Sequence, residues 1–467
     1  MHITKKGSGK KQLGTFFIML LSLGSVLSLR NLAFLAGQGL STIFYYGIAV
    51  SCFMIPYALI AADLVSIFPG GIFVWVKEAF GPRWGFIAVW FQWFHNITWY
   101  PAVLAFFTLS FGRLVFPELI ENKFFFLSVI LVIFWSLTFI NFLRLSFSSY
   151  LSTICLFIGT IIPGCILSGM ALIWLIKGNH SYLSISAREI FPTSNGLMTS
   201  IAMISGAFLT FTGLETNSNL VLEMKNPRKN YPIALFMAAG LLMFFLVGGT
   251  LAVAIAIPKE ELNLITALLD ALGIFLGSTG HDWLTKTLSI AILLGILGQM
   301  NVWMLGPIKG LWNSAQYGCL PQAFTKVNKN NSPVFILLFQ ACIVSIAACG
   351  FLFISNFSIA YWILNLLCTQ VCFMMYIIMI CAALVLHHRH PEKKQKYGLL
   401  KSNFSIWSLS ILGLLSILCA LGIGFIPPYN LITPDQRFIY EAVIISGFLI
   451  CLALPFFMYQ DKKNQIS

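Results

Sequence analysis

Charged residues are scarce in this chain of 467 residues, where Asp, Glu, Lys and Arg together make up 9%. Soluble globular domains carry about a quarter, and 58% of this chain is hydrophobic, so a soluble globule is excluded. The apolar residues gather in continuous runs of about 20, the length that a helix needs to cross the hydrocarbon core of a membrane. The sequence therefore predicts an all-α, multi-pass membrane protein.

Acidic residues are especially few, with 15 Asp and Glu against 28 Lys and Arg, which gives a formal net charge of +13. If both termini are cytoplasmic, 20 of the 28 basic residues lie in cytoplasmic segments, seven lie outside, and Arg30 lies within a span. This asymmetry is typical of membrane topology and not of nucleic-acid binding. We therefore expect a plasma-membrane protein, the bacterial inner membrane included, with the lipid bilayer as a partner and no nucleic acid.

Clusters that could hold a metal or a cofactor are also lacking. The 11 cysteines, from Cys52 to Cys451, lie in or beside apolar runs, as packing residues do. The run from His387 to His390 stands beside Lys393, so a solvated loop is favoured over a metal site. Without a nucleophile elbow or cofactor loop, we expect no enzyme and no cofactor.

Windows of about 20 apolar residues predict twelve spans. They are 14–37, 42–66, 84–111, 124–142, 150–176, 198–222, 232–257, 285–308, 333–354, 358–386, 404–424 and 438–459. We expect a cytoplasmic N-tail (1–13), a ten-helix core (14–386) of inverted repeats at about 14–176 and 198–386, a basic cytoplasmic loop (387–403), two additional helices (404–459) and a short cytoplasmic C-tail (460–467).

Both predicted halves open with a helix interrupted by small residues. Gly24-Ser25 with Ser28 stand in the first span, and Thr212-Gly213 with Thr216 stand in the sixth. Five spans per half would place the two copies in opposite orientations, as in secondary carriers. Lipid tolerates irregular backbone only beside a cavity or buried protein, so a binding site is predicted where the two interruptions meet.

Three long blocks resemble a known family. They read FPGGIFVWVKEAFGPRWGF at 68–86, FTGLETNSNLVLEMKNPRKNYP at 211–232, and GPIKGLWNSAQYGCLPQ at 306–322. Together they resemble the amino acid–polyamine–organocation superfamily of carriers, and within it the glutamate/γ-aminobutyrate antiporter branch. The resemblance covers nearly the whole chain. It implies a LeuT-like fold of five plus five spans and two extra helices.

The resemblance also implies an amino acid held between spans one and six. Backbone N–H groups near Gly24, Ser25 and Ser28 would receive its carboxylate, and oxygens near Thr210, Thr212 and Gly213 its ammonium. Glu215 stands inside a predicted span, where an unpaired carboxylate costs about 2.5–3.5 kcal/mol. In relatives the matching acid couples gating or protonation to transport; a structural hydrogen bond is the alternative.

Further polar residues within spans are candidates for the site or for gating. Gln92, His95, Asn96 and Trp99 share one helix face, and Gln299 and Asn365 lie in spans eight and ten. Helix–helix pairing is the alternative for the amides, and an interior imidazole without a transport role is the alternative for His95. Asp63, near the end of span two, is expected to fix the cytoplasmic gate. Arg30 either lines the pocket or snorkels outward.

Departures from the antiporter branch bear on the substrate. Arg30-Asn31 stands where that branch has a tyrosine and an acidic residue, and Gln299 stands where it has a glutamate. The chain ends eight residues after Tyr459, so we expect no plug for the inner vestibule. These changes favour a more anionic or differently shaped ligand.

The functional prediction is an amino acid antiporter, exchanging an amino acid or its decarboxylated amine as a monomer or homodimer. A proton- or sodium-coupled amino acid symporter is the alternative, and a non-transporting membrane sensor is a distant one.

Overall fold

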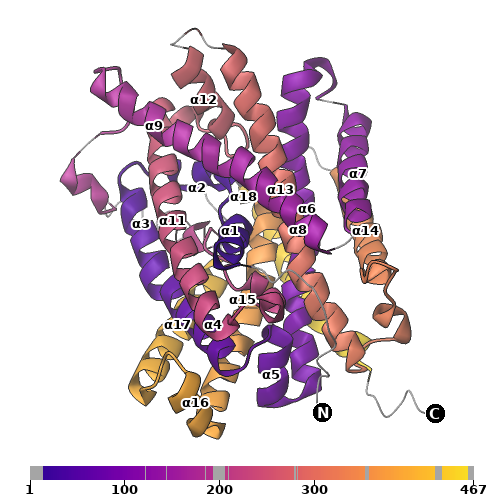
Figure 1. Ribbon diagram of the computed structural model, residues 1–467. Helices are drawn as coiled ribbons and strands as arrows, with labels where there is room; N and C mark the ends of the chain where they lie inside the picture. Colours follow the sequence, from indigo (N-terminus) through magenta and orange to yellow (C-terminus); the bar gives the residue numbers. More distant parts are fainter. Residues whose placement is uncertain are drawn as a thin grey trace.

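The computed structural model is a bundle of α-helices, and its described residues contain no β-strand (Figure 1). The described residues are 14–120, 122–143, 145–184, 186–192, 204, 206–208, 210–277, 280, 282–352, 357–425 and 434–460. Within them, nine helices are long and apolar enough to cross a membrane, and a bent helix pair makes a tenth.

The bent pair is the predicted first span. Helix α1 (Thr15–Val26) is followed by a 3₁₀ turn, η1 (Leu29–Leu32), and the short helix α2 (Ala33–Ala36), at an angle of 47°. Extended backbone at Leu27 and Ser28 produces the bend, with ψ angles of 107° and 112°. Of the small residues at which the break was expected, Gly24 and Ser25 lie within α1, which ends at Val26, whereas Ser28 lies at the bend.

The predicted sixth span is also irregular. Its first residues, 198–203, lie outside the described part of the chain. Residues 210–215 form turns, with Gly213 at a φ of +111°, and a 3₁₀ helix, η7 (Thr216–Glu223), follows them. Positive φ is a conformation that glycine adopts readily and that side-chain-bearing residues rarely adopt. Gly213 thus marks the interruption that the sequence predicted.

The other spans follow the predicted order. They are α3 (Ser41–Ala49) continued through a π-helical turn η2 (Val50–Met54) into α4 (Ile55–Ile67); α6 (Pro82–Val115); α7 (Lys123–Ile140); α8 (Leu145–Leu156) continued through a π-helical turn η4 (Phe157–Ile161) into α9 (Ile162–Ile176); α11 (Pro227–Ala256); α13 (Asp282–Gln316); α14 (Val334–Cys349); α15 (Phe357–Arg389); α17 (Asn403–Ile423); and α18 (Pro434–Met458). Helix α6 is about 51 Å long at 1.5 Å per residue, although its aromatic and amide residues keep it outside the nine apolar helices.

Three short helices were not expected from hydropathy. They are α5 (Ile72–Phe80), α12 (Ala267–Gly277) and α16 (Pro391–Tyr397). Shorter 3₁₀ turns lie at Pro117–Leu119 (η3), Ala187–Ile190 (η5), Lys259–Glu261 (η8), Gln322–Thr325 (η9) and Gly350–Leu352 (η10). Helix α16 lies within the segment that was expected to be a solvated loop.

Burial separates central helices from peripheral ones. In the most apolar window of α13, 78% of residues are buried, whereas in α18 the share is 22%. Helix α1 lies in the middle of the bundle, among α11, α8 and α13 (Figure 1). Gly159 of η4 and Gly295 of α13 let these two elements approach closely, because a Cβ at Gly159 would lie 2.1 Å from the Ala291 carbonyl oxygen. The broken first span is thus enclosed by tightly packed helices.

Candidate functional site

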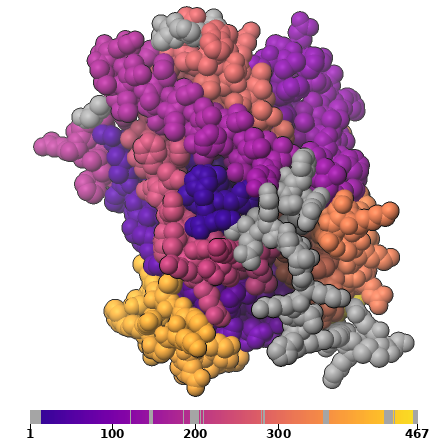
Figure 2. All heavy atoms as spheres, in the orientation of Figure 1, coloured from indigo at the N-terminus to yellow at the C-terminus, as the bar shows by residue number. Residues whose placement is uncertain are grey.

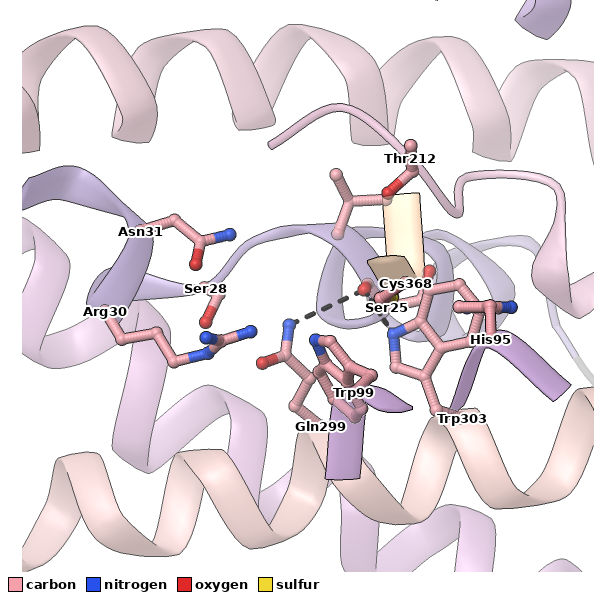
Figure 3. A pocket seen from close by; sticks show the side chains of 11 residues that line it. Ser25, Ser28, Arg30, Asn31, His95, Trp99, Thr212, Gln299, Trp303 and Cys368 are labelled. Carbon is pink, nitrogen blue, oxygen red and sulfur yellow. Dashed lines mark hydrogen bonds between the residues drawn. The ribbon is translucent and has the colours of Figure 1, made fainter. Parts of the chain in front are cut away.

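A small polar cavity lies beside the bend of the first span (Figure 3). It measures about 20 Å³, room for about one water molecule. Its lining comes from the first span, the turn before η7, and helices α6, α13 and α15. The lining residues are Ser25, Val26, Ser28, Arg30, Asn31, His95, Trp99, Thr212, Gln299, Trp303 and Cys368. Seven of the candidates singled out in the sequence therefore meet here: Ser25, Ser28, Arg30, His95, Trp99, Thr212 and Gln299.

Backbone carbonyls at the end of α1 point toward α13. The Trp303 indole N–H donates to the Ser25 carbonyl at 2.7 Å, and the Gln299 amide donates to the carbonyls of Ser25 at 3.5 Å and Leu27 at 3.3 Å. Because a carbonyl oxygen has two lone pairs, the Leu27 carbonyl can accept a further hydrogen bond, whereas the Ser25 carbonyl already accepts from two donors. The bend thus presents acceptors to the cavity, held in place by two side chains of α13.

Arg30 brings a buried positive charge to the cavity. The residue is 2% exposed, so it does not snorkel to a surface. Its guanidinium donates to the Tyr361 hydroxyl at 2.5 Å and to the Asn365 side-chain oxygen at 3.5 Å, while its Nε has no hydrogen-bond partner. No carboxylate in the described part of the chain forms an ion pair with it. A buried cation without a counterion favours an incoming anion.

Aromatic rings form one wall of the cavity. Trp303 packs edge-on to the His95 ring at a centroid distance of 4.8 Å and lies 5.9 Å from Trp99. The Arg30 guanidinium carbon lies 5.6 Å from the centre of the Trp99 ring and 5.7 Å from that of Tyr361. His95 Nδ1 lies 3.3 Å from the Phe91 carbonyl on its own helix. These rings exclude water, and exclusion of water strengthens electrostatic interactions within the cavity.

Gly213 lies directly behind Trp303, outside the cavity lining. A Cβ at this position would lie 2.4 Å from Cζ2 of Trp303. Its carbonyl accepts a hydrogen bond from the Ser25 hydroxyl at 2.9 Å, and its N–H donates to the Tyr376 hydroxyl at 2.8 Å. Gly213 thus joins the two interrupted spans and α15 at one point.

Glu215 follows Gly213 by two residues, lies outside the cavity lining and is fully buried. The Tyr376 hydroxyl donates to Oε2 of Glu215 at 2.7 Å, whereas Oε1 of Glu215 has no hydrogen-bond partner. Gln92 of α6 lies near this carboxylate and accepts a hydrogen bond from Asn219 at 3.0 Å. Glu215 and Gln92 therefore belong to a buried polar layer next to the cavity, along η7.

Four other predicted residues lie outside the cavity lining. Gly24 packs against α8, where its Cβ would meet Leu156 at 2.0 Å. The Thr210 hydroxyl donates to the Ala207 carbonyl, and the Asn96 amide donates to the Gln92 carbonyl on the same helix. Asn365 contacts the site through Arg30. Their part in binding stays a prediction.

Asp63 lies at a different place, at the end of α4 near α15 and α16. It is buried, and its carboxylate contacts Nε2 of His387 at 2.5 Å and accepts hydrogen bonds from the backbone N–H groups of Leu399 at 2.6 Å and Leu400 at 2.8 Å. His387 thus binds a carboxylate, and the described residues hold no metal-binding group of three His, Cys, Asp or Glu side chains. Asp63 connects α4 to the segment that follows α15.

Four lining residues, Val26, Asn31, Trp303 and Cys368, were not among the predicted site residues. Asn31 follows Arg30, Val26 precedes the bend, and Cys368 lies three residues after Asn365, one turn further along α15. Trp99 was singled out because its spacing from Gln92 and His95 places the three residues on one helix face. Nothing in the sequence indicated that Trp303 would donate to the first span.

Comparison with known proteins agrees with this architecture. The family model for amino acid permeases matches residues 13–449. An uncharacterized transporter of Legionella pneumophila is 35% identical over 459 residues, which cover 98% of both chains. A glutamate/gamma-aminobutyrate antiporter of Lactococcus lactis is 27% identical over 469 residues, covering 97% of this chain and 92% of that protein.

A probable agmatine/putrescine antiporter of Lactococcus lactis is 23% identical over 337 residues, covering 69% of this chain and 68% of that protein. The family match spans most of the chain, and the fold, a bundle of apolar helices around an interrupted first span, suits a LeuT-like carrier. The chain therefore belongs to the amino acid permease family of the amino acid–polyamine–organocation superfamily and is a multi-pass membrane transporter.

Proposed function

We propose that this protein is an antiporter that exchanges an amino acid with an acidic side chain, glutamate-like in charge, for a related amino acid or its decarboxylated amine. The observation that carries the proposal is Arg30, a buried guanidinium at the cavity without an ion-pair partner among the described residues. At an effective dielectric constant of about 20, a carboxylate about 4 Å away would gain about 4 kcal/mol before desolvation costs. That gain separates acidic from neutral substrates.

Hydrogen-bond acceptors at the bend of the first span suit the ammonium group of an amino acid. The Leu27 carbonyl has a lone pair left after its bond to Gln299, the Ser25 carbonyl lies beside it, and Thr212 also lines the cavity. An ammonium group there and a side-chain carboxylate at Arg30 would place a zwitterion with one extra negative charge across the bend. Ser28 and Asn31, between these ends, are placed to contact the α-carboxylate.

The activities of two relatives bear on which substrate this chain carries. One relative exchanges glutamate and gamma-aminobutyrate, and another is a probable exchanger of agmatine and putrescine. Agmatine and putrescine carry two positive charges, which Arg30 would repel at short range. The charge of the cavity therefore supports an acidic amino acid over a diamine for this chain.

Transport requires this cavity to open, because it has room for about one water molecule and an amino acid is several times larger. We propose alternating access within a ten-helix core, residues 14–386, with both termini cytoplasmic and the last two helices added to it. Glu215, His95 and Asp63 are the proposed gating or proton-coupling residues. Glu215 suits that role because it is buried, half satisfied, and one Tyr376 hydroxyl links it to Gly213.

The test is exchange in proteoliposomes containing the full chain. Uptake of labelled glutamate should require an unlabelled amino acid inside, and a proton or sodium gradient alone should not drive it. Uptake into empty vesicles driven by either gradient would instead show a symporter. Substrate binding without any uptake would indicate a sensor, and strong exchange of putrescine with none of glutamate would refute the acidic substrate.

A further inference from the structure

A basic surface lies at the end of the bundle where α11 begins and α15 ends. Two segments form it, residues 225–230 and 391–402, which together hold seven Lys or Arg and one acidic residue, Glu392. Six of the seven are exposed, and they are Lys225, Arg228, Lys229, Lys393, Lys396 and Lys401. We call these six residues the basic surface. We propose that it binds the headgroups of anionic phospholipids at the membrane surface.

The two segments are held together by specific contacts. The Arg228 guanidinium carbon lies 3.8 Å from the centre of the Tyr397 ring, and the Lys396 ammonium lies 5.3 Å from the same centre. The Ser66 hydroxyl of α4 donates to the Arg228 carbonyl at 3.2 Å. The charges of two segments separated by more than 150 residues in the sequence therefore form one surface, even though like charges repel.

The segment after α15 is fixed to the transmembrane bundle. Asp63 of α4 accepts hydrogen bonds from Leu399 and Leu400, and buried Lys394 donates to the Asn403 side chain at 2.5 Å. A Cβ at Gly398 would lie 2.6 Å from the Lys394 carbonyl oxygen, so the chain turns tightly against itself here. A segment held in this way presents its lysines at a fixed height relative to the helices.

Apolar side chains beside the basic surface favour a lipid over a free phosphate. Lys401 stands three residues before Phe404, which is 81% exposed on the first turn of α17, and Trp407 follows it on the same helix at 56%. Leu222, 64% exposed, precedes Lys225 in the same way. Cations within about one turn of exposed apolar residues match the depth profile of a headgroup above acyl chains. Figures 1 and 2 show α16 and α17 projecting together at one corner of the molecule.

The ligand class follows from charge and position. Phosphatidylglycerol and other anionic phospholipids supply a phosphate to the lysines and acyl chains to Phe404 and Trp407. Each cation near an anionic membrane surface increases the affinity for that surface by about a factor of five. Such binding would hold α11, α4 and the segment after α15 together, independently of which substrate the cavity accepts.

Native mass spectrometry of the full chain in detergent tests the proposal, with phosphatidylglycerol and phosphatidylcholine as the probes. Lys393→Gln with Lys396→Gln should weaken phosphatidylglycerol binding on the order of tenfold and leave phosphatidylcholine binding unchanged. The matched control is Lys326→Gln with Lys329→Gln, which removes two exposed lysines from the loop after α13, at the same end of the bundle.

Three results would overturn the proposal. They are unchanged phosphatidylglycerol binding in the Lys393/Lys396 variant, an equal loss in both variants, and full competition by inorganic phosphate or glycerol phosphate at concentrations comparable to the lipid. Unchanged binding would show that Lys393 and Lys396 do not form the site. An equal loss in both variants would show that only the total charge of the protein matters. Full competition would show that the site binds free phosphate and not a lipid. Melting temperatures of both variants, measured without lipid, establish that neither has simply lost its fold.

Discussion

At the scale of single residues, Gly213 connects the backbone of the sixth span to the packing of the cavity. Its φ of +111° suits glycine, and a Cβ would lie 2.4 Å from Trp303, whose indole in turn donates to the Ser25 carbonyl. A side chain at 213 therefore displaces Trp303 from the bend of the first span. The residue has no side chain to bind substrate, yet it sets the position of one that lines the cavity.

We predict that Gly213→Ala reduces substrate binding at least tenfold, because the strained φ and the contact with Trp303 together cost about 2–4 kcal/mol. Binding is measured by scintillation proximity with purified protein. Gly240→Ala is the matched control: Gly240 lies in α11 with nothing within 4 Å of its Cβ position, so binding should be unchanged. Normal affinity in Gly213→Ala would place the binding site away from Trp303.

The polar residues of the site show what a sequence can and cannot predict at this scale. Arg30 and Gln299 were singled out as polar residues within spans, and Ser25 and Ser28 as small residues that interrupt one. Asn365 shares that signal but faces Arg30 instead of the cavity. The direction of a side chain depends on how two helices rotate against each other, which no spacing along one helix determines.

At the scale of elements, the junction of α4, α15 and the segment after α15 depends on one carboxylate. Asp63 has three partners, Nε2 of His387 and the N–H groups of Leu399 and Leu400. The sequence predicted that Asp63 acts at a gate, but gave no indication of these partners, which are more than 300 residues away. The spacing of residues along one helix cannot predict hydrogen bonds to residues that are so distant in the sequence.

We predict that Asp63→Asn lowers the free energy of unfolding by about 2–4 kcal/mol, because the change places an amide donor among buried groups that now donate to a carboxylate. Thermal unfolding in detergent measures the loss. Asp270→Asn removes a carboxylate from an exposed pair with Arg113, which should cost less than about 1 kcal/mol. Equal effects of the two substitutions would show that the buried hydrogen bonds of Asp63 stabilise the protein no more than an exposed ion pair does.

Helix boundaries were predicted best for spans that consist of one uninterrupted apolar run. Long apolar runs produced α7, α11 and α14 close to their expected positions. The bend in the first span came later than its glycine, since Gly24 is used to approach Leu156 and the chain leaves the helix at Leu27. Glycine indicates either close packing or a break, and the sequence alone did not distinguish these two uses.

At the scale of the whole molecule, the proposed orientation rests on the distribution of basic residues. We predict that a cysteine at Lys401 reacts only after the membrane is permeabilised, whereas one at Asn179 reacts with an impermeant maleimide in intact cells. Both positions are exposed, and the native cysteines would be replaced first. The opposite labelling pattern would reverse the orientation, and with it the side on which Asp63 acts.

The central claim for the whole molecule is that Arg30 selects an acidic substrate. The most direct test is competition of unlabelled glutamate and glutamine against labelled substrate in proteoliposomes, comparing the parent chain with Arg30→Gln and Arg30→Lys. The account predicts that Arg30→Gln weakens glutamate at least tenfold more than glutamine, because about 4 kcal/mol of attraction before desolvation is lost only for the charged side chain, while Arg30→Lys keeps part of the preference. An unchanged ranking of glutamate and glutamine in Arg30→Gln would contradict it.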